Sequence, residues 1–203
     1  MDFKNWLLDF ISSLVIIFRR YLSLVFTPYK TMRKISLEED WLQVYIVAGF
    51  ITLYFYVRSF WIKLPFAPWL YILLFILDFA FTVVFFYLIG FILNKQTSWN
   101  SLIFTLSYSL YPTITWFLAN SIFYILIPPP RTFSLLGRAF SIFFLTFSLS
   151  LLFWKIILVY LAIRFSTKLN FFSILYLILL YLLFFIPLLY AMYLFGFTLI
   201  PFI

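Results

Sequence analysis

The chain contains no cysteine and no histidine, and only 10% of its 203 residues are charged. Disulfides, thiol nucleophiles, imidazole bases and metal sites built from Cys or His are therefore excluded. Glycine occurs only four times, with neither a glycine-rich phosphate loop nor a GxxxG pair, and no carboxylate pair stands near a nucleophile. We therefore expect no catalytic residue, no cofactor site and no metal site, and we predict that the protein is not an enzyme.

Apolar side chains make up most of the sequence instead. They account for 67% of the residues, and the formal net charge is +8. The basic residues lie between apolar blocks rather than on one soluble face, a pattern that favours contact with lipid headgroups over contact with nucleic acid. The composition predicts an integral membrane protein whose first partner is the lipid bilayer and which binds no nucleic acid.

Five apolar stretches are long enough to cross a bilayer as helices, for which about 20 residues are needed. These stretches are residues 41–62, 69–93, 102–127, 139–163 and 171–200. Their apolar runs are continuous, which excludes the alternating strands of a barrel. The sequence thus predicts an all-α, polytopic membrane protein with two parts. Residues 1–35 form a cytoplasmic amphipathic segment, and residues 36–203 form a domain of five transmembrane helices.

The cations in the connecting segments predict the orientation of the spans. On the side of the N-terminus lie Lys4, Arg19, Arg20, Lys30, Arg33, Lys34, Lys95, Arg164 and Lys168. On the opposite side lie only Arg58, Lys63, Arg131 and Arg138. Because short cytoplasmic segments carry the excess of Lys and Arg, we expect a cytoplasmic N-terminus and an external C-terminus.

Residues 6–26 form an apolar segment that is interrupted by charged residues. Its longest uncharged run is too short to cross a bilayer. At about 100° per residue, its polar side chains gather within an arc of roughly 120°. Together with the flanking residues Asn5 and Thr27, they are Asp9, Ser12, Ser13, Arg19, Arg20 and Ser23, and Ile16 is the one apolar residue on this arc. This pattern predicts an interfacial amphipathic helix, with Arg19, Arg20, Trp6 and Phe10 in contact with the lipid surface. A cleaved signal peptide and a sixth span are less favoured, and docking onto the bundle is favoured over sensing of anionic lipid or curvature.

The start of the first span carries a predicted capping box. Pro28 is expected to break the preceding helix. The Ser36 hydroxyl is then expected to accept a hydrogen bond from the Glu39 backbone N–H, while the Glu39 side chain reaches back. Glu38, Glu39 and Asp40 also favour the positive end of the helix dipole. We therefore expect the first helix of the membrane domain to begin near Leu37.

Two charged residues lie well inside the predicted spans, Asp78 in the second and Lys155 in the fourth. Such residues cost several kcal/mol unless they are paired or hydrated. Measured from the connecting turns, Asp78 lies level with about Trp116 of the third span, and Lys155 lies level with about Tyr111. The two levels differ by about 7–8 Å, a gap that a lysine side chain can bridge. We therefore expect one polar focus within the membrane.

Pro112 lies between these two levels and is expected to kink the third span, because it frees a carbonyl near Tyr108. The candidate intramembrane site comprises Asp78, Lys155, Ser109, Tyr111, Pro112, Thr113 and Asn120. In one interpretation, Asp78 and Lys155 are an ion pair or separately satisfied groups that lock the bundle; in the other, they form a site for an ion or a polar solute. We favour the lock, because no relay chain and no inverted repeat accompanies the charges.

Several short elements also carry a family resemblance. They are Phe26-Thr27-Pro28 followed by Met32 and Ile35, the segment from Gln96 to Ser101, and Tyr108-Ser109-Leu110-Tyr111-Pro112. Together with the five spans, they resemble the Yip domain family, the Ypt/Rab-interacting membrane proteins and their prokaryotic relatives. The chain lacks the long polar cytoplasmic region of eukaryotic members, so it looks more like a prokaryotic member, in the cytoplasmic membrane. The resemblance implies a non-enzymatic protein that works through partners, in bacteria beside transport complexes such as ABC exporters.

We therefore expect an integral membrane scaffold or accessory subunit of a membrane assembly, in trafficking or beside a transport complex. Its partners within the membrane would be another protein, such as an ABC-type transporter, or a second copy of the chain. The first alternative is a small transporter or channel-like protein that uses Asp78 and Lys155. The second alternative is a lipid-packing or curvature factor that acts through the N-terminal helix.

Overall fold

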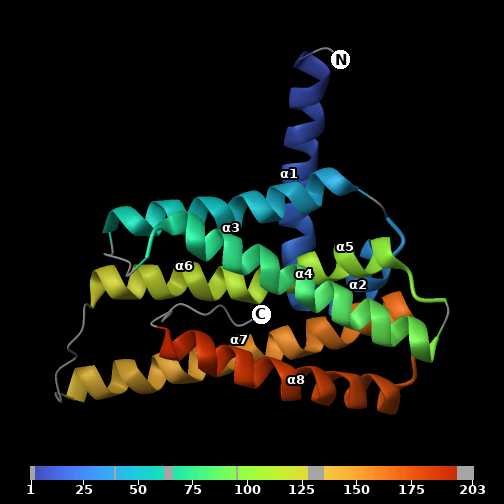
Figure 1. Ribbon diagram of the computed structural model, residues 1–203. Helices are drawn as coiled ribbons and strands as arrows, with labels where there is room; N and C mark the ends of the chain where they lie inside the picture. Colours follow the sequence, from blue (N-terminus) through green and yellow to red (C-terminus); the bar gives the residue numbers. More distant parts are fainter. Residues whose placement is uncertain (1–2, 39, 62–65, 95, 128–134, 196–203) are drawn as a thin grey trace.

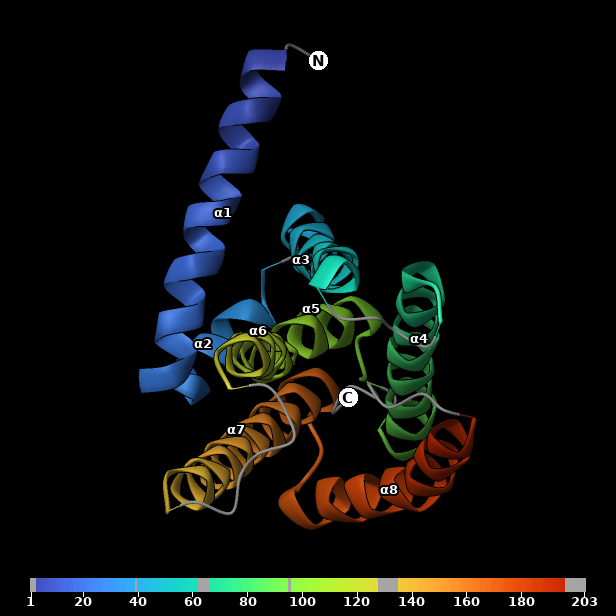
Figure 2. The same ribbon diagram turned by 90° about the vertical axis from the view of Figure 1, so that its left-hand side faces the viewer.

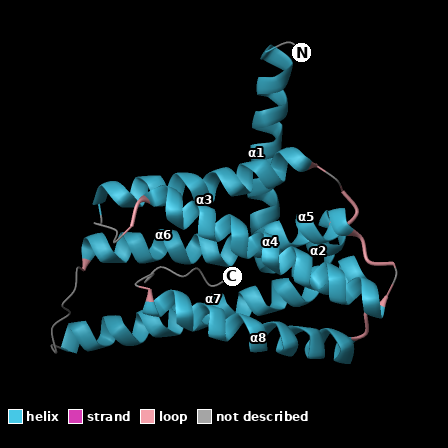
Figure 3. Cartoon of the chain, viewed as in Figure 1, coloured by secondary structure: helices cyan, strands magenta, loops and turns pink. Residues whose placement is uncertain are grey.

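The computed structural model of the chain describes residues 3–38, 40–61, 66–94, 96–127 and 135–195. Within these ranges the chain forms eight α-helices and no strand (Figure 3). The helices are α1 (Phe3–Phe26), α2 (Pro28–Ile35), α3 (Trp41–Trp61), α4 (Pro68–Leu93), α5 (Trp99–Ser109), α6 (Tyr111–Leu126), α7 (Leu135–Thr167) and α8 (Phe171–Leu194). The predicted all-α class is confirmed.

Five helical segments are long and apolar enough to cross a membrane, which confirms the predicted number of spans. Helices α3, α4, α7 and α8 each form one span, and α5 and α6 together form the third span. The third span begins at Trp99, three residues before the expected residue 102, because the Ser98 hydroxyl caps the helix by accepting a hydrogen bond from the Ser101 N–H. The expected ends at residues 62 and 200 lie outside the described residues. The chain is an integral membrane protein.

The third span lies at the centre of the bundle. Seen along the spans, α5 and α6 lie between α3, α4 and α7, while α8 lies outside, next to α4 and α7 (Figure 2). Of the most apolar 18-residue window of the third span, 67% is buried, against 17% to 39% for the other four spans. The most extensive contact between helices joins α5 and α7. The polar side chains of the third span therefore face other helices rather than lipid.

The third span is broken at the predicted position. Helix α5 ends at Ser109, Leu110 joins the two helices, and Pro112 lies in the first turn of α6. Proline is tolerated there because the first N–H groups of a helix have no partner within it. The Leu110 N–H donates to the Ser107 carbonyl at 3.2 Å, so the backbone tightens by one residue at the break. The helix is therefore interrupted where the sequence predicts a kink.

Helix α1 lies across the direction of the five spans instead of parallel to them, and its N-terminal half extends beyond the bundle (Figure 1). Its described side chains form three strips along the helix. The strip against the bundle contains the buried residues Ser13, Ile17, Arg20 and Leu24. An exposed apolar strip contains Leu8, Ile11, Val15, Phe18, Leu22 and Val25. An exposed polar strip contains Asp9, Ser12 and Arg19.

The expected capping box is wrong at Ser36. A short helix that the sequence did not indicate, α2, begins at Pro28 and buries Thr31, Met32 and Ile35. The Ser36 hydroxyl donates to the Arg33 carbonyl at 2.8 Å and so closes the end of α2. The next helix begins at Trp41, with the Leu42 N–H donating to Oδ1 of Asp40 at 3.1 Å. Glu39 lies outside the described residues.

Candidate functional site

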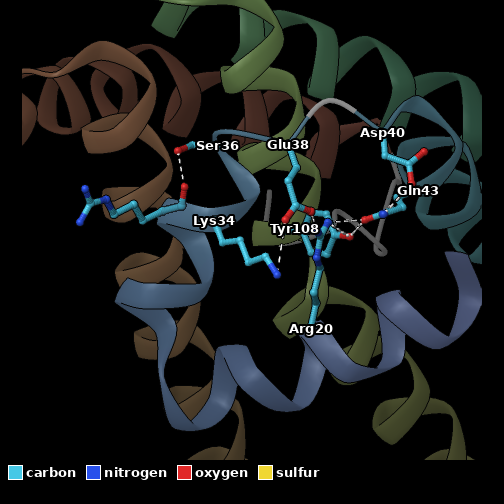
Figure 4. A network of polar contacts seen from close by, with 8 residues as sticks. Arg20, Lys34, Ser36, Glu38, Asp40, Gln43 and Tyr108 are labelled. Carbon is cyan, nitrogen blue, oxygen red and sulfur yellow. Dashed lines mark hydrogen bonds and ion pairs between the residues drawn. The ribbon is translucent and has the colours of Figure 1, made fainter.

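The first candidate region is a polar network that fixes α1 to the bundle (Figure 4). The Arg20 side chain points inward from α1 and is only 9% exposed. Its guanidinium forms an ion pair with Glu38 and donates to Oε1 of Gln43 and, at 3.0 Å, to the hydroxyl of Tyr108. The Tyr108 hydroxyl also donates to Gln43 Oε1. Helices α1, α3 and α5 therefore meet through one buried cation.

The Gln43 amide completes this network by donating from Nε2 to Oδ2 of Asp40 at 2.6 Å. The acidic residues before α3 thus have two different roles. Asp40 caps the helix and orients Gln43, while Glu38 neutralises Arg20 and lies 3.6 Å from the Lys34 ammonium. Charge-assisted contacts of this kind are the stronger hydrogen bonds of a fold, so the network defines where α1 sits.

The predicted lipid-surface residues divide between two environments. The prediction that Arg20 contacts the lipid surface is wrong, because its side chain contacts protein instead. Arg19, one residue and about 100° further round the helix, is exposed on the polar strip. Phe10 is half-buried and packs against the core of the bundle. The side chain of Trp6 lies outside the described residues. The polar arc in the sequence does not show whether a given polar side chain faces water or a polar group of the bundle.

The second candidate region is the intramembrane charge on α7. Lys155 is buried, with 6% exposure, and its ammonium donates to the Thr113 hydroxyl of α6 at 2.7 Å. One turn along, Nε1 of Trp116 donates to the hydroxyl of Ser148 at 3.2 Å. The cavity that these residues share with Pro112 has a volume of about 10 Å³, which is about the space of one water. Little space is therefore left beside the lysine where α6 and α7 meet.

Asp78 lies on α4 and does not pair with Lys155. Among the described residues, the ion pairs within 4.0 Å are those of Glu38 with Arg20 and with Lys34. The sequence left open whether Asp78 and Lys155 form an ion pair or are separate groups, and in the structure they are separate groups with no ion pair between them. Asp78 is 7% exposed, and its Oδ1 has no hydrogen-bond partner within the described part of the chain. Its backbone carbonyl accepts a hydrogen bond from Thr82, whose hydroxyl lies 2.8 Å from the hydroxyl of Tyr181 on α8.

The other residues of the predicted site do not converge on Lys155. Ser109 is buried and donates to the Leu106 carbonyl of its own helix at 2.7 Å. The Tyr111 ring packs edge-on against the ring of Tyr21, with centroids 5.3 Å apart, and so contacts α1. Asn120 is half-buried further along α6. Of the predicted set, the structure thus brings Lys155, Pro112 and Thr113 together, whereas Asp78, Ser109, Tyr111 and Asn120 lie elsewhere.

A third polar cluster joins the C-terminal ends of α4 and α7 to the N-terminal end of α5. The Ser166 hydroxyl lies 3.2 Å from that of Ser101 and 3.0 Å from that of Thr105. The Ser166 carbonyl also accepts the Ser98 N–H at 3.1 Å. The Asn94 amide donates to the Thr167 carbonyl at 2.8 Å. The segment from Gln96 to Ser101, part of the resemblance to the Yip domain family, thus leads directly into a helix junction.

Sequence reasoning missed several residues that the structure places in these clusters. Gln43, Tyr108 and Ser166 were not candidates, although each is at most 2% exposed. An amide within an apolar segment is a signal that was available for Gln43, because a buried amide needs partners. Hydroxyls spaced by four residues, as in Ser101 and Thr105, are the corresponding signal for a helix contact.

The described residues contain no group of three or more potential metal-ligating carboxylates. Comparison of the chain with protein-family models, with curated proteins and with solved structures finds no match in any of the three. The resemblance to the Yip domain family therefore stays a prediction that rests on the sequence elements named above.

Proposed function

We propose that the protein is a non-enzymatic scaffold or accessory subunit of a membrane assembly, similar to a compact prokaryotic member of the Yip domain family. In this proposal the N-terminus is cytoplasmic, the C-terminus is external, and the chain works through a protein partner in the prokaryotic cytoplasmic membrane. The partner is a transport complex, such as an ABC-type exporter, or a second copy of the chain.

The use of the polar groups inside the membrane supports this proposal. Lys155 is held by Thr113, and the cavity beside it is only about 10 Å³. The Trp116 N–H binds Ser148, and the hydroxyls of Ser101 and Thr105 lie against that of Ser166. Side chains that line a passage must face water or solute, whereas these groups bind one another across helices. The single observation that carries the proposal is that Lys155 is bound by Thr113 with space for only about one water beside it.

The outward face of α7 is the surface where we expect the partner. Thr146 and Ser150 are exposed near the middle of this helix, and each hydroxyl donates to a carbonyl of its own helix at 2.9 Å. Only 17% of the most apolar window of α7 is buried. Small hydroxyl residues favour close approach of a second helix within a bilayer, and these two face away from the bundle.

Photo-crosslinking in native membranes tests the proposal. A photoreactive residue at position 150 is expected to give one discrete protein adduct, whose mass distinguishes a second copy from another protein. The matched control is position 77 on α4, because Leu77 is 56% exposed and also lies near the middle of its helix. Adducts with lipid alone at both positions would contradict the proposal.

Asp78 favours a second candidate function, a small transporter or channel-like protein. Its buried Oδ1 lacks a hydrogen-bond partner among the described residues, and a polar residue inside a membrane without a partner marks a functional site more often than not. Purified protein in liposomes would then carry an ion or solute flux, and Asp78→Asn would abolish that flux while the protein still folds. If Asp78→Asn and Lys155→Met reduce only the folding yield, the lock is supported.

A further inference from the structure

A cationic pocket lies between the polar strip of α1 and the short helix α2. Its volume is about 420 Å³. The charged residues that line it are Arg19, Arg20, Lys30, Lys34 and Glu38. Four cations face one carboxylate, so the pocket carries three positive charges in excess.

The single carboxylate is already engaged. Glu38 forms an ion pair with Arg20, and the Lys34 ammonium lies 3.6 Å from its other oxygen (Figure 4). Arg19 and Lys30 have no ion pair within the part of the chain that the structure describes. An anion that enters the pocket would therefore find two cations, Arg19 and Lys30, that pair with no described carboxylate, next to Lys34, which shares Glu38 with Arg20.

The hydroxyls of the pocket do not add selectivity for neutral ligands. Ser23 donates to the Arg19 carbonyl at 2.9 Å, and Thr31 donates to the Thr27 carbonyl at 2.9 Å. Since these hydrogens are engaged with backbone, recognition falls to the charged side chains. Lys and Arg clusters of this kind bind phosphate groups strongly, because each donor is charged.

The position of the pocket on α1 suits a ligand at the membrane surface. The exposed apolar strip of α1, with Val15, Phe18 and Leu22, runs directly beside the exposed polar strip that carries Arg19. When the apolar strip faces acyl chains, the polar strip and the pocket face the headgroup layer. Basic segments in that layer attract anionic lipids.

We propose that the pocket between α1 and α2 is a binding site for a phosphate group. The ligand is a phosphomonoester or a comparable phosphate anion, supplied by a lipid headgroup or by free phosphate. The site does not depend on the partner proposed above, because it needs only the residues of α1, α2 and Glu38.

The test measures ligand-dependent thermal unfolding of the full chain in an uncharged detergent, followed by tryptophan fluorescence. The probes are a short-chain phosphatidic acid, inorganic phosphate and a short-chain phosphatidylcholine. We expect saturable stabilisation by phosphatidic acid or by inorganic phosphate, and none by phosphatidylcholine, whose headgroup is zwitterionic. Stabilisation by phosphatidic acid alone identifies lipid as the source, and equal stabilisation by inorganic phosphate identifies the free anion.

The variant Arg19→Gln/Lys30→Gln is expected to weaken phosphate binding about tenfold to thirtyfold, since two cations next to the anion are lost. The matched control, Arg33→Gln/Lys168→Gln, removes the same charge from exposed residues that do not line the pocket, and it should change affinity less than about twofold. Lys30→Glu provides a further variant at an exposed position and should abolish binding. Equal losses in the double variant and its control, or no saturable binding of either phosphate probe, would overturn the proposal.

Discussion

Substitution of glycine by alanine is predicted to have opposite effects on stability at two positions in the spans, Gly90 and Gly49. Gly90 lies on α4 where α5 and α7 meet it, and a Cβ atom there would lie 2.9 Å from Cγ2 of Thr167 and 3.2 Å from Oγ1 of Thr97. Neither threonine can rotate away freely. The Thr167 hydroxyl donates to the Ile163 carbonyl at 2.7 Å, and the Thr97 hydroxyl donates to the Asn94 carbonyl at 2.9 Å.

The magnitude follows from two opposing contributions. Overpacking of a tight contact costs about 1–3 kcal/mol, whereas alanine in a helix is favoured over glycine by about 0.5–1 kcal/mol. Gly90→Ala should therefore lower the free energy of unfolding by up to about 2.5 kcal/mol. At Gly49 on α3, a Cβ would meet nothing within 4 Å. Gly49→Ala should then raise the free energy of unfolding by about 0.5–1 kcal/mol.

Unfolding in a mild detergent, followed by tryptophan fluorescence, compares the two variants. The double variant Gly90→Ala/Thr167→Ser removes the nearest methyl carbon while it keeps the hydroxyl, so it should recover most of the loss. If Gly90→Ala stabilises the protein as much as Gly49→Ala, or if Thr167→Ser brings no recovery, the close approach of α4 to α7 is refuted.

Two further predictions concern α1 and the threading of the chain. Arg20→Met removes a charged donor from Glu38, Gln43 and Tyr108, which should weaken the docking of α1 by about 2 kcal/mol. Hydrogen exchange of the α1 amides should then be about thirtyfold faster, while Arg19→Met leaves it unchanged; equal exchange in both variants would contradict the network. In this cysteine-free chain, Gln96→Cys and Ala67→Cys lie at exposed positions on opposite sides of the spans, so an impermeant thiol reagent should label them from opposite faces of sealed vesicles. Labelling from one face would show that the threading is wrong.

The number of spans and their helical type could be predicted from the sequence because hydrocarbon imposes a single requirement on the backbone. In hydrocarbon the backbone must satisfy its own hydrogen bonds, so a continuous apolar run becomes a helix whatever its neighbours are. The break at Pro112 was predictable for the same local reason. Helix α2 was missed because its eight residues bury only Thr31, Met32 and Ile35, a pattern too short to distinguish from a loop.

The candidate site was predictable along the spans but not around them. Lys155 was expected level with about Tyr111, and it binds Thr113, two residues or about 3 Å away along the helix. Rise along a helix follows from residue number, whereas the rotation of one helix against another depends on side-chain packing. That rotation directs Lys155 toward α6 instead of Asp78. For the same reason, the inward direction of Arg20 was not visible in the amphipathic pattern of α1.

The hydroxyls of the third span have a consequence for biosynthesis. Thr105 reaches its cross-helix partner Ser166 over 61 residues of chain, which the ribosome must still translate when the third span enters the bilayer. Meanwhile Thr105 donates to the carbonyl of Ser101 at 2.7 Å, and Thr115 does the same to Tyr111 at 2.8 Å. The hydroxyls of Thr105 and Thr115 can thus form hydrogen bonds within their own span as soon as it is inserted. The third span can therefore remain in lipid before the fourth span is inserted.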